Sequence, residues 1–403
     1  MTKGWKEKKL GEITTKIGSG ATPLGGENAY KSEGISLIRS LNVHDAGFKY
    51  KDLAFLDDPQ ANKLSNVIVE SGDVLLNITG ASIARCCIVP DDILPARVNQ
   101  HVSIIRLVKD EMLPEFLHYV LISNEYKDSL LKTGEKGGST RQALTKAQIE
   151  EFSIKYPPLP EQQRIVSLLD ETFESIAGAK VNAERNLVNA RELFETLLNE
   201  YFGHARKGWK EMKLDDACIV ERGSSPRPIK QYQTTSKDGV NWIKIGDTKN
   251  VEKYIYSTRE KITKEGAKQS RFVKEGDFIL TNSMSFGNPY IMKTEGYIHD
   301  GWFVLRLKEF IDTEFFWYLL VSPFVRNQFN QLASGAIVKN ISGDLVKKAV
   351  LYIPPLAEQR AIVARLDVLA GETKKLAGIY QSKLEGLEEL KKSVLARAFE
   401  GEI

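Results

Sequence analysis

The chain has 403 residues, of which 42% are hydrophobic and 27% are charged, and its formal net charge at pH 7 is only +3. This length predicts two globular domains with connecting segments. The small net charge excludes a uniformly basic nucleic-acid binder, so any basic surface must be local. No apolar run is long enough to cross a membrane, and the N-terminus lacks the apolar core of a signal peptide. We therefore expect a soluble cytoplasmic protein with no membrane partner.

The two halves of the chain repeat each other. Gly4-Trp5-Lys6-Glu7 returns as Gly208-Trp209-Lys210-Glu211, and Pro157-Pro158-Leu159-Pro160-Glu161-Gln162 returns as Pro354-Pro355-Leu356-Ala357-Glu358-Gln359. Between these landmarks, Gly72-Asp73 before an apolar run matches Gly276-Asp277 before another, in the same order along the chain. A repeat of this length indicates a duplication rather than an array of short repeats. We therefore expect two copies of one fold.

Each half begins with short apolar runs separated by Gly, Pro, Asn and Asp, which is typical of strands and turns. Predicted strands cover residues 67–69, 74–76, 102–107, 278–280 and 302–305. Predicted helices lie near residues 114–123 and 313–322. The predicted class is α+β, with two mixed α/β domains.

A long helix follows each Pro-Pro-Leu step. Pro160 can occupy a first helical turn, and Glu161 lies favourably near the positive end of the helix dipole. Apolar positions then recur at alternating steps of three and four residues, with one doubled step of four midway in both copies. Such a seam needs a partner surface, because a helix cannot bury its own apolar stripe. The predicted pairing residues are Ile165, Leu169, Ile176, Leu187, Phe194, Leu197, Ile362, Leu366, Leu369, Leu376, Leu387 and Val394.

Two arrangements could bury these seams. Each helix could pack on its own globular domain, or the two helices could pair with each other as an antiparallel coiled coil, which we favour. Roughly 40 helical residues extend about 60 Å. Antiparallel pairing would therefore place the domains at opposite ends of a spacer, related by an approximate two-fold axis. That spacing is somewhat less than two turns of duplex DNA, whose repeat is about 34 Å.

Residue types that carry catalysis are poorly placed in this chain. Cys86, Cys87 and Cys218 offer neither a disulfide framework nor a zinc-ligand spacing, and buried packing is their expected role. The five histidines are scattered, and no phosphate-binding loop motif occurs. Asn288-Pro289-Tyr290 is only weakly similar to the Asn-Pro-Pro-aromatic loop of amino-methyltransferases. We therefore expect no catalytic residue, no bound metal and no cofactor in this chain.

The whole order of elements resembles the specificity subunit of type I restriction-modification systems. The resemblance rests on the two Gly-Trp starts and on the two Pro-Pro-Leu-x-Glu-Gln steps, each followed by a long helix. It implies target-recognition domains at residues 1–157 and 204–354, a central helical region at 158–203 and a C-terminal helical region at 355–403. It also implies a non-catalytic subunit that reads an asymmetric bipartite site in double-stranded DNA, with one domain for each half-site.

The same resemblance implies the partners. Two modification subunits would dock on the helices and methylate adenine with S-adenosylmethionine, and restriction subunits would use ATP and Mg²⁺. The alternatives are a self-sufficient DNA adenine methyltransferase, or a two-headed protein scaffold without DNA specificity.

Base edges are read by Arg, Lys, Asn, Gln, Ser and Thr, and phosphates are bound by cations. Candidates follow turns and flexible glycines in both halves. In the first domain they are Ser19, Thr22, Arg39, Asn77, Thr79, Ser82, Arg85, Lys136, Ser139, Thr140, Arg141 and Gln142. In the second domain they are Arg222, Ser224, Ser225, Arg227, Lys230, Lys244, Asn282, Ser283, Ser285, Lys339 and Asn340.

Overall fold

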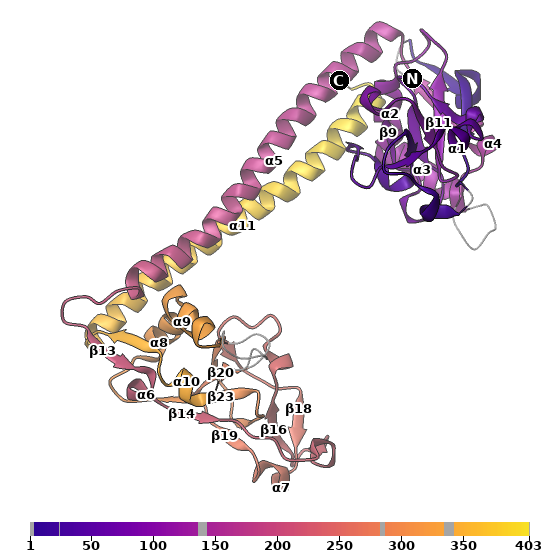
Figure 1. Cartoon of the computed structure of the whole chain (residues 1–403). Helices are drawn as coiled ribbons and strands as arrows, with labels where there is room; N and C mark the ends of the chain where they lie inside the picture. Colours follow the sequence, from indigo (N-terminus) through magenta and orange to yellow (C-terminus); the bar gives the residue numbers. More distant parts are fainter. Residues whose placement is uncertain (1–3, 24, 136–142, 283–286, 334–341, 403) are drawn as a thin grey trace. The chain divides into compact units, whose positions relative to one another are not determined.

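The chain forms two compact units in a computed structural model, which describes residues 4–23, 25–135, 143–282, 287–333 and 342–402 (Figure 1). The first unit consists of residues 1–183 and 382–403, and the second of residues 184–381. Each unit contains one globular domain together with part of each long helix. The units are described separately below.

The first domain contains two four-stranded sheets, with strand orders β6-β3-β10-β7 and β2-β11-β8-β9. A two-stranded sheet, β1-β12, joins its start to its end. The strands are β1 (Lys6–Lys9), β2 (Thr14–Ser19), β3 (Ile35–Ile38), β4 (Val43–His44), β5 (Gly47–Phe48), β6 (Ala54–Leu56), β7 (Ile68–Val69), β8 (Val74–Asn77), β9 (Cys86–Ile88), β10 (Ala96–Val98), β11 (Val102–Leu107) and β12 (Ser153–Tyr156). The helices are α1 (Asp58–Asn62), α2 (Pro114–Ile122), α3 (Asn124–Glu135), α4 (Lys146–Glu150) and the start of α5 (Leu159–Phe202).

The second domain repeats this topology and adds one strand to each sheet. Its sheets have the orders β15-β18-β16-β22-β19 and β14-β23-β20-β21-β17, and β13 pairs with β24. The strands are β13 (Lys210–Lys213), β14 (Cys218–Arg222), β15 (Gln233–Thr234), β16 (Val240–Ile243), β17 (Tyr254–Ile255), β18 (Glu260–Ile262), β19 (Arg271–Val273), β20 (Phe278–Thr281), β21 (Pro289–Met292), β22 (Gly296–Ile298), β23 (Trp302–Leu307) and β24 (Val350–Ile353). The helices are α6 (Leu214–Ala217), α7 (Lys264–Ala267), α8 (Thr313–Val321), α9 (Pro323–Ala333), α10 (Gly343–Val346) and α11 (Leu356–Glu400).

The hydrophobic core of the first domain has two layers that share β8. Val74 and Leu76 belong to the cluster that contains α2, whereas Leu75 belongs to the cluster between the two sheets. Successive side chains of a strand point to opposite faces, so a strand buried on both faces needs a continuous apolar run. The apolar run at residues 74–76 therefore predicts β8 from the sequence. One predicted strand was too long, because Val67 belongs to a 3-10 helix, Ser65–Val67.

The long helices pair in opposite directions in both units. In the first unit, Ile165 and Leu169 near the start of α5 share a core with Leu395 near the end of α11. In the second unit, Phe202 at the end of α5 shares a core with Ile362 near the start of α11. The antiparallel coiled coil is therefore confirmed. The other arrangement, in which each helix packs on its own globular domain, also holds in part. The start of α5 packs on the first domain, and the start of α11 packs on the second.

The predicted seams lie on the buried faces of the helices. All twelve predicted pairing residues are buried or half-buried, while exposed residues separate them. Leu197 is half-buried, but its neighbour Leu198 lies deeper because the end of α5 turns that side chain into the core of the second domain. Between the helices of the first unit, Lys180 Nζ lies 2.5 Å from a Glu388 carboxylate oxygen.

A buried glutamine ties each helix to its domain. The Gln162 carbonyl oxygen accepts the Leu113 N–H at 2.9 Å, and its amide donates to the Pro157 carbonyl at 2.8 Å. In the second unit, the Gln359 oxygen accepts the Asp312 N–H at 2.7 Å, and its amide donates to the Pro354 carbonyl at 2.9 Å. Both glutamines are fully buried. The last residue of the Pro-Pro-Leu-x-Glu-Gln motif therefore fixes the helix start against the loop before α2 or α8.

We expect Gln162→Ala to destabilise the first unit, because it leaves the half-buried Leu113 N–H and the buried Pro157 carbonyl without their Gln162 partner. Unsatisfied buried groups cost about 1–3 kcal/mol each, so the free energy of unfolding should fall by about 3 kcal/mol. Hydrogen exchange of α2 and β12 peptides measures this loss. The matched control is Gln163→Ala, whose side chain is exposed. Unchanged protection of α2 in Gln162→Ala would contradict the role of the buried amide.

Candidate nucleic-acid interface

Strand ends of the first domain meet at one edge. In the parallel pair β3–β10, Ile38 lies opposite Val98, so both strands end together. Ser19 at the end of β2 lies opposite Ser103 near the start of β11, and Asn77 at the end of β8 lies opposite Val102. Four strands therefore end where β11 begins.

The turn between β10 and β11, residues 99–101, holds this edge together. Gly20 N–H donates to the Asn99 carbonyl, Asn99 N–H donates to the Ile38 carbonyl, and Ile78 N–H donates to the His101 carbonyl. The turn is thus bonded to the ends of β2, β3 and β8. A side chain at Gly20 would clash, because an added Cβ would lie 1.8 Å from the Val98 carbonyl oxygen. We call this surface the strand-end edge.

The second domain has the same strand-end edge. Ile243 lies opposite Ile298, Thr281 opposite Trp302, and Arg222 opposite Phe303. An added Cβ at Gly223 would lie 2.0 Å from the His299 carbonyl oxygen. Sequence candidates that end these strands or follow their ends are Ser19, Thr22, Arg39, Asn77, Thr79, Ser82, Arg222, Ser224, Ser225, Lys244 and Asn282.

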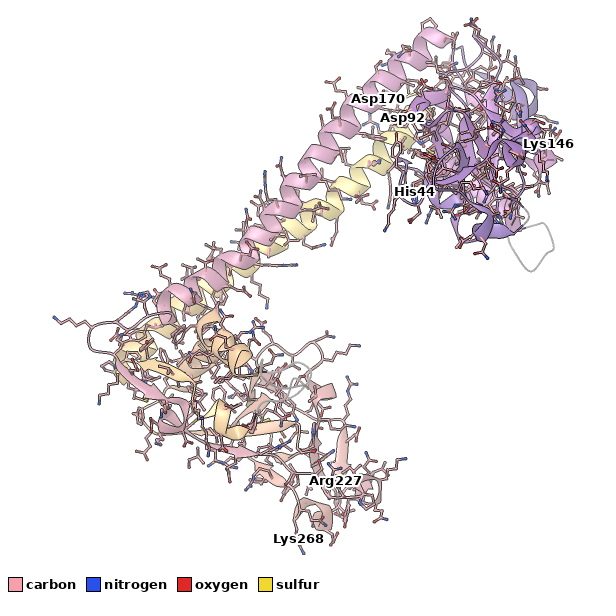
Figure 2. All side chains as sticks on the ribbon, in the orientation of Figure 1. His44, Asp92, Lys146, Asp170, Arg227 and Lys268 are labelled. Carbon is pink, nitrogen blue, oxygen red and sulfur yellow. The ribbon has the colours of Figure 1, made fainter. Side chains whose placement is uncertain are left out.

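A shallow hollow lies beside the edge of the first domain. Its walls include three of the candidates, Thr79, Ser82 and Arg85, together with His44 and His101. The Thr79 hydroxyl lies 2.5 Å from His101 Nδ1. His44 is marked on this domain in Figure 2.

Residues 143 and 144, which follow the glycine-rich segment of the first domain, lie beside this hollow. Ala143 forms a bridge with Thr79, and Leu144 N–H donates to the Ile78 carbonyl. The candidates Lys136, Ser139, Thr140, Arg141 and Gln142 themselves lie outside the described residues. So do Ser283, Ser285, Lys339 and Asn340 in the second domain.

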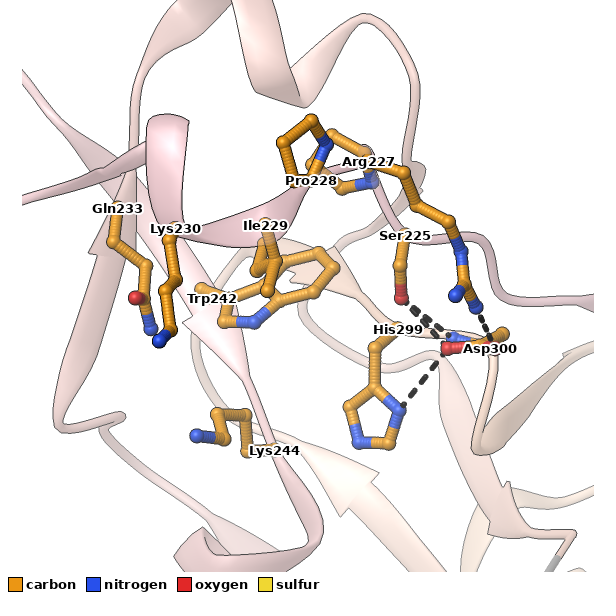
Figure 3. Close-up of a pocket in the computed structure, with 11 residues that line it drawn as sticks. Ser225, Arg227, Pro228, Ile229, Lys230, Gln233, Trp242, Lys244, His299 and Asp300 are labelled. Atoms are coloured by element: carbon orange, nitrogen blue, oxygen red, sulfur yellow. Dashed lines mark hydrogen bonds and ion pairs between the residues drawn. The ribbon is translucent and has the colours of Figure 1, made fainter.

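A larger hollow of about 790 Å³ lies beside the edge of the second domain (Figure 3). Four candidates line it, namely Ser225, Arg227, Lys230 and Lys244. The buried Trp242 provides an apolar wall. A basic pocket with an aromatic wall is a favourable surface for a base or a phosphate.

Asp300 organises the polar groups of this hollow. Its Oδ1 accepts the Ser225 hydroxyl at 2.7 Å, and its Oδ2 lies 3.1 Å from Arg227 Nη2 (Figure 3). The hydrogen bond from Ser225 holds the pKa of Asp300 below its usual range, so the carboxyl is ionised at neutral pH. Burial lowers the pKa of His299, whose Nδ1 accepts the Gly301 N–H at 2.8 Å. In the neutral ring the proton is therefore on Nε2.

Three candidates are occupied by structural contacts. Asn77 is fully buried and donates to the Ser40 carbonyl at 2.9 Å, and the buried Asn282 donates to the Asp300 carbonyl at 2.6 Å. Arg39 donates to the Asp52 carbonyl at 2.6 Å, and its guanidinium lies 5.1 Å from the centre of the Tyr30 ring. In this structure all three side chains donate hydrogen bonds to backbone carbonyls and so stabilise the strand-end edge.

Other candidates that the structure describes at the two edges are half-buried or exposed. The half-buried Thr22 is hydrogen-bonded to Gln100, and Ser19 is half-buried at the end of β2. Ser224 donates to the Gln269 carbonyl at 2.9 Å, and the exposed Arg222 contacts the Asp300 carbonyl at 3.4 Å. Lys244 Nζ lies 2.7 Å from Glu260.

The sequence analysis does not identify Gln100 or Asp300. Gln100 lies in the turn between β10 and β11, and Asp300 lies in the equivalent turn between β22 and β23. Both follow a short buried strand that was not predicted, β10 or β22. An alignment of the two halves on the predicted strands at residues 102–107 and 302–305 puts Gln100 and Asp300 at equivalent positions.

The weak methyltransferase-like segment has another role. Pro289 and Tyr290 begin β21, where both are buried, and the Tyr290 ring packs edge-on against Trp302 at 6.0 Å between centres. Asn288 N–H donates to the Thr281 hydroxyl at 3.0 Å. The segment is a buried strand rather than an exposed catalytic loop.

The cysteines are buried, as predicted. Burial raises the pKa of the Cys87 and Cys218 thiols to about 12, which keeps them protonated. Within the described residues, no group of three or more His, Cys, Asp or Glu is arranged to hold a metal ion. In the same part of the chain, no helix is long and apolar enough to cross a membrane.

Comparison with known proteins identifies the family. Residues 2–184 and 206–381 each match the family model described as the type I restriction modification DNA specificity domain. Because the two matches cover most of the chain, the chain belongs to this family of type I specificity subunits.

Curated relatives and solved structures agree with this assignment. The chain is 23% identical over 385 residues to the type I restriction enzyme MjaVIII specificity subunit of Methanocaldococcus jannaschii, covering 88% of this chain and 86% of the relative. It is 22% identical over 426 residues to the StySPI specificity subunit of Salmonella potsdam, covering 100% and 90%.

The fold is also that of solved type I structures. A chain from a type I restriction-modification system aligns with a TM-score of 0.80 at 20% identity, covering 100% of this chain and 99% of the other. The HsdS subunit from Thermoanaerobacter tengcongensis aligns with a TM-score of 0.69 at 21% identity, covering 100% and 98%. These likenesses confirm the predicted fold class.

We expect Asn77→Ala to lower the stability of the first domain by about 2 kcal/mol, because the Ser40 and Val43 carbonyls lose a buried donor. Urea unfolding of the full chain measures the change. Ser82→Ala is the control, because Ser82 lines the hollow and is only half-buried. Equal stability of the two variants would show that the Asn77 amide does not support the edge.

Proposed function

We propose that this chain is the DNA-recognition subunit of a type I restriction-modification complex, in which each strand-end edge reads one half of a bipartite site. One observation carries the proposal: the same edge is built twice on the same strands, but different side chains line it. A repeated framework with divergent surface residues is what an asymmetric site requires. The family assignment supports this function over a self-sufficient methyltransferase or a scaffold without DNA specificity.

The paired helices are the proposed docking surface for two modification subunits. Large apolar side chains remain exposed on both helices, on the faces that do not form the coiled coil. They are Leu168, Val181, Val188, Leu193, Val368, Ile379 and Leu390. Exposed apolar residues of this kind are a common feature of protein interfaces.

We propose further that chemistry belongs to the partners. Modification subunits would bind S-adenosylmethionine and methylate adenine, and restriction subunits would use ATP and Mg²⁺. This chain would contact DNA only to select the sequence and to position the partner subunits on it.

Methylome sequencing tests the function directly. A host that expresses this chain with its modification subunits should carry a bipartite methylated motif, which disappears when this chain is deleted. Replacing residues 1–157 with the same region of another specificity subunit should change one half of the motif and keep the other. Methylation without this chain would contradict the proposal, and S-adenosylmethionine binding by the isolated chain would favour the methyltransferase alternative.

We also expect Lys230→Ala to weaken DNA binding by the assembled methyltransferase complex. Lys230 is exposed beside the second hollow, and loss of one phosphate contact lowers the slope of log affinity against log salt by about 0.9. Fluorescence anisotropy at several salt concentrations measures the slope. Lys210→Ala is the matched control, because Lys210 is an exposed lysine on the separate β13–β24 sheet. If Lys230→Ala and Lys210→Ala gave the same slope of log affinity against log salt, the hollow of the second domain would not contact DNA.

A further inference from the structure

Residues 100 and 300 occupy equivalent positions in the two domains. Val98 and Ile298 end β10 and β22, and each lies opposite the last residue of the parallel strand beside it. Val102 and Trp302 begin β11 and β23. The three-residue turns between these strands therefore correspond one to one, with Gln100 and Asp300 in the middle.

The partner of each residue also corresponds. Ser19 and Arg222 occupy equivalent register positions, opposite Ser103 and Phe303. Three residues later stand Thr22 and Ser225. The Thr22 hydroxyl donates to the Gln100 carbonyl oxygen, and the Ser225 hydroxyl donates to Asp300 Oδ1 at 2.7 Å. Both copies therefore have a hydroxyl that orients the turn side chain, while the side chain itself is an amide in the first domain and a carboxylate in the second.

Both side chains stand on rigid turns and reach solvent. Gln100 is exposed, and the side chain of Asp300 is 45% exposed. The Asn99 side chain accepts the His101 N–H at 3.0 Å, and Asn282 donates to the Asp300 carbonyl at 2.6 Å. Fixed backbone under an exposed polar tip is the arrangement that selective base recognition needs.

The remaining hydrogen-bonding capacity of Gln100 suits adenine. Its carbonyl oxygen has two lone pairs, of which Thr22 uses one, and its amide has two N–H donors, of which one faces His101 Nε2 at 3.1 Å. One acceptor and one donor are left. That pair matches the N6 amino group and N7 of adenine in the major groove.

The Asp300 site has a different character. Its ionised carboxylate can only accept, which suits the N4 amino group of cytosine. Arg227 lies 3.1 Å from it, and the Arg227 side chain is 79% exposed, so further guanidinium N–H groups are available. Arginine donates to O6 and N7 of guanine. The two side chains together offer complementary groups to both bases of one G·C pair (Figure 3).

We propose that positions 100 and 300 are equivalent specificity determinants: Gln100 reads an adenine in one half-site, and Asp300 with Arg227 reads one G·C pair in the other. This inference rests on the proposed function and adds the residues and the bases. It also predicts that Asp300 and Arg227 act on the same base pair.

The test uses the full chain co-expressed with its modification subunits, with methylome sequencing as the readout. Asp300→Asn and Arg227→Ala should each relax the same G·C position, with discrimination falling about 10-fold to 100-fold. Gln100→Glu should relax one adenine position in the other half-site. Asp238→Asn is the control, because Asp238 is an exposed aspartate of the same domain and should leave the motif unchanged.

The outcomes separate the inference from the proposed function. A wild-type complex without a bipartite motif refutes the function. A bipartite motif that Arg227→Ala leaves unchanged refutes the inference, and so does relaxation of different base pairs by Arg227→Ala and Asp300→Asn. If Asp300→Asn fails to fold, Arg227→Ala and Gln100→Glu still test the inference. Both variants alter exposed side chains, so they should fold.

Discussion

The junction between each domain and its helix depends on one buried amide. Gln162 and Gln359 each accept a backbone N–H from the start of α2 or α8, and each donates to the proline carbonyl before the long helix. A buried amide left without partners would be costly, so all three segments must keep their positions together. The helix direction relative to its own domain follows from this constraint.

Other partly buried polar contacts occur in both domains between equivalent residues. Arg106 contacts Asp73 at 2.8 Å, and Arg306 contacts Asp277 at 3.3 Å. The Tyr119 hydroxyl donates to Asp170 of α5, which Figure 2 marks on that helix, and Tyr318 donates to Asp367 of α11. The framework is therefore conserved between the halves in its polar interior as well as in its apolar pattern. At the strand-end edges the side chains differ, as with Gln100 in the first domain and Asp300 at the equivalent position of the second.

Local sequence patterns predicted the elements with strong local causes. The sequence predicts strand β11 with its observed bounds, because Val102, Ile104 and Ile105 are β-branched apolar residues that favour a strand, and it predicts both long helices from proline and the seam spacing. The role of Gln162 was missed, since nothing in the chain marks which loop its amide will meet. Gln100 and Asp300 were missed for the same reason. Their position depends on parallel pairing between strands far apart in sequence, which no local pattern encodes.

The first compact unit is discontinuous in sequence, and this has a consequence for biosynthesis. Its core includes Leu395 and Ala398 of α11, and the Phe399 ring packs edge-on against Phe116 at 5.6 Å between centres. A ribosome makes the first domain long before these residues exist. The nascent first domain must therefore persist with part of its apolar surface uncovered, and that core closes only after the second domain has been translated.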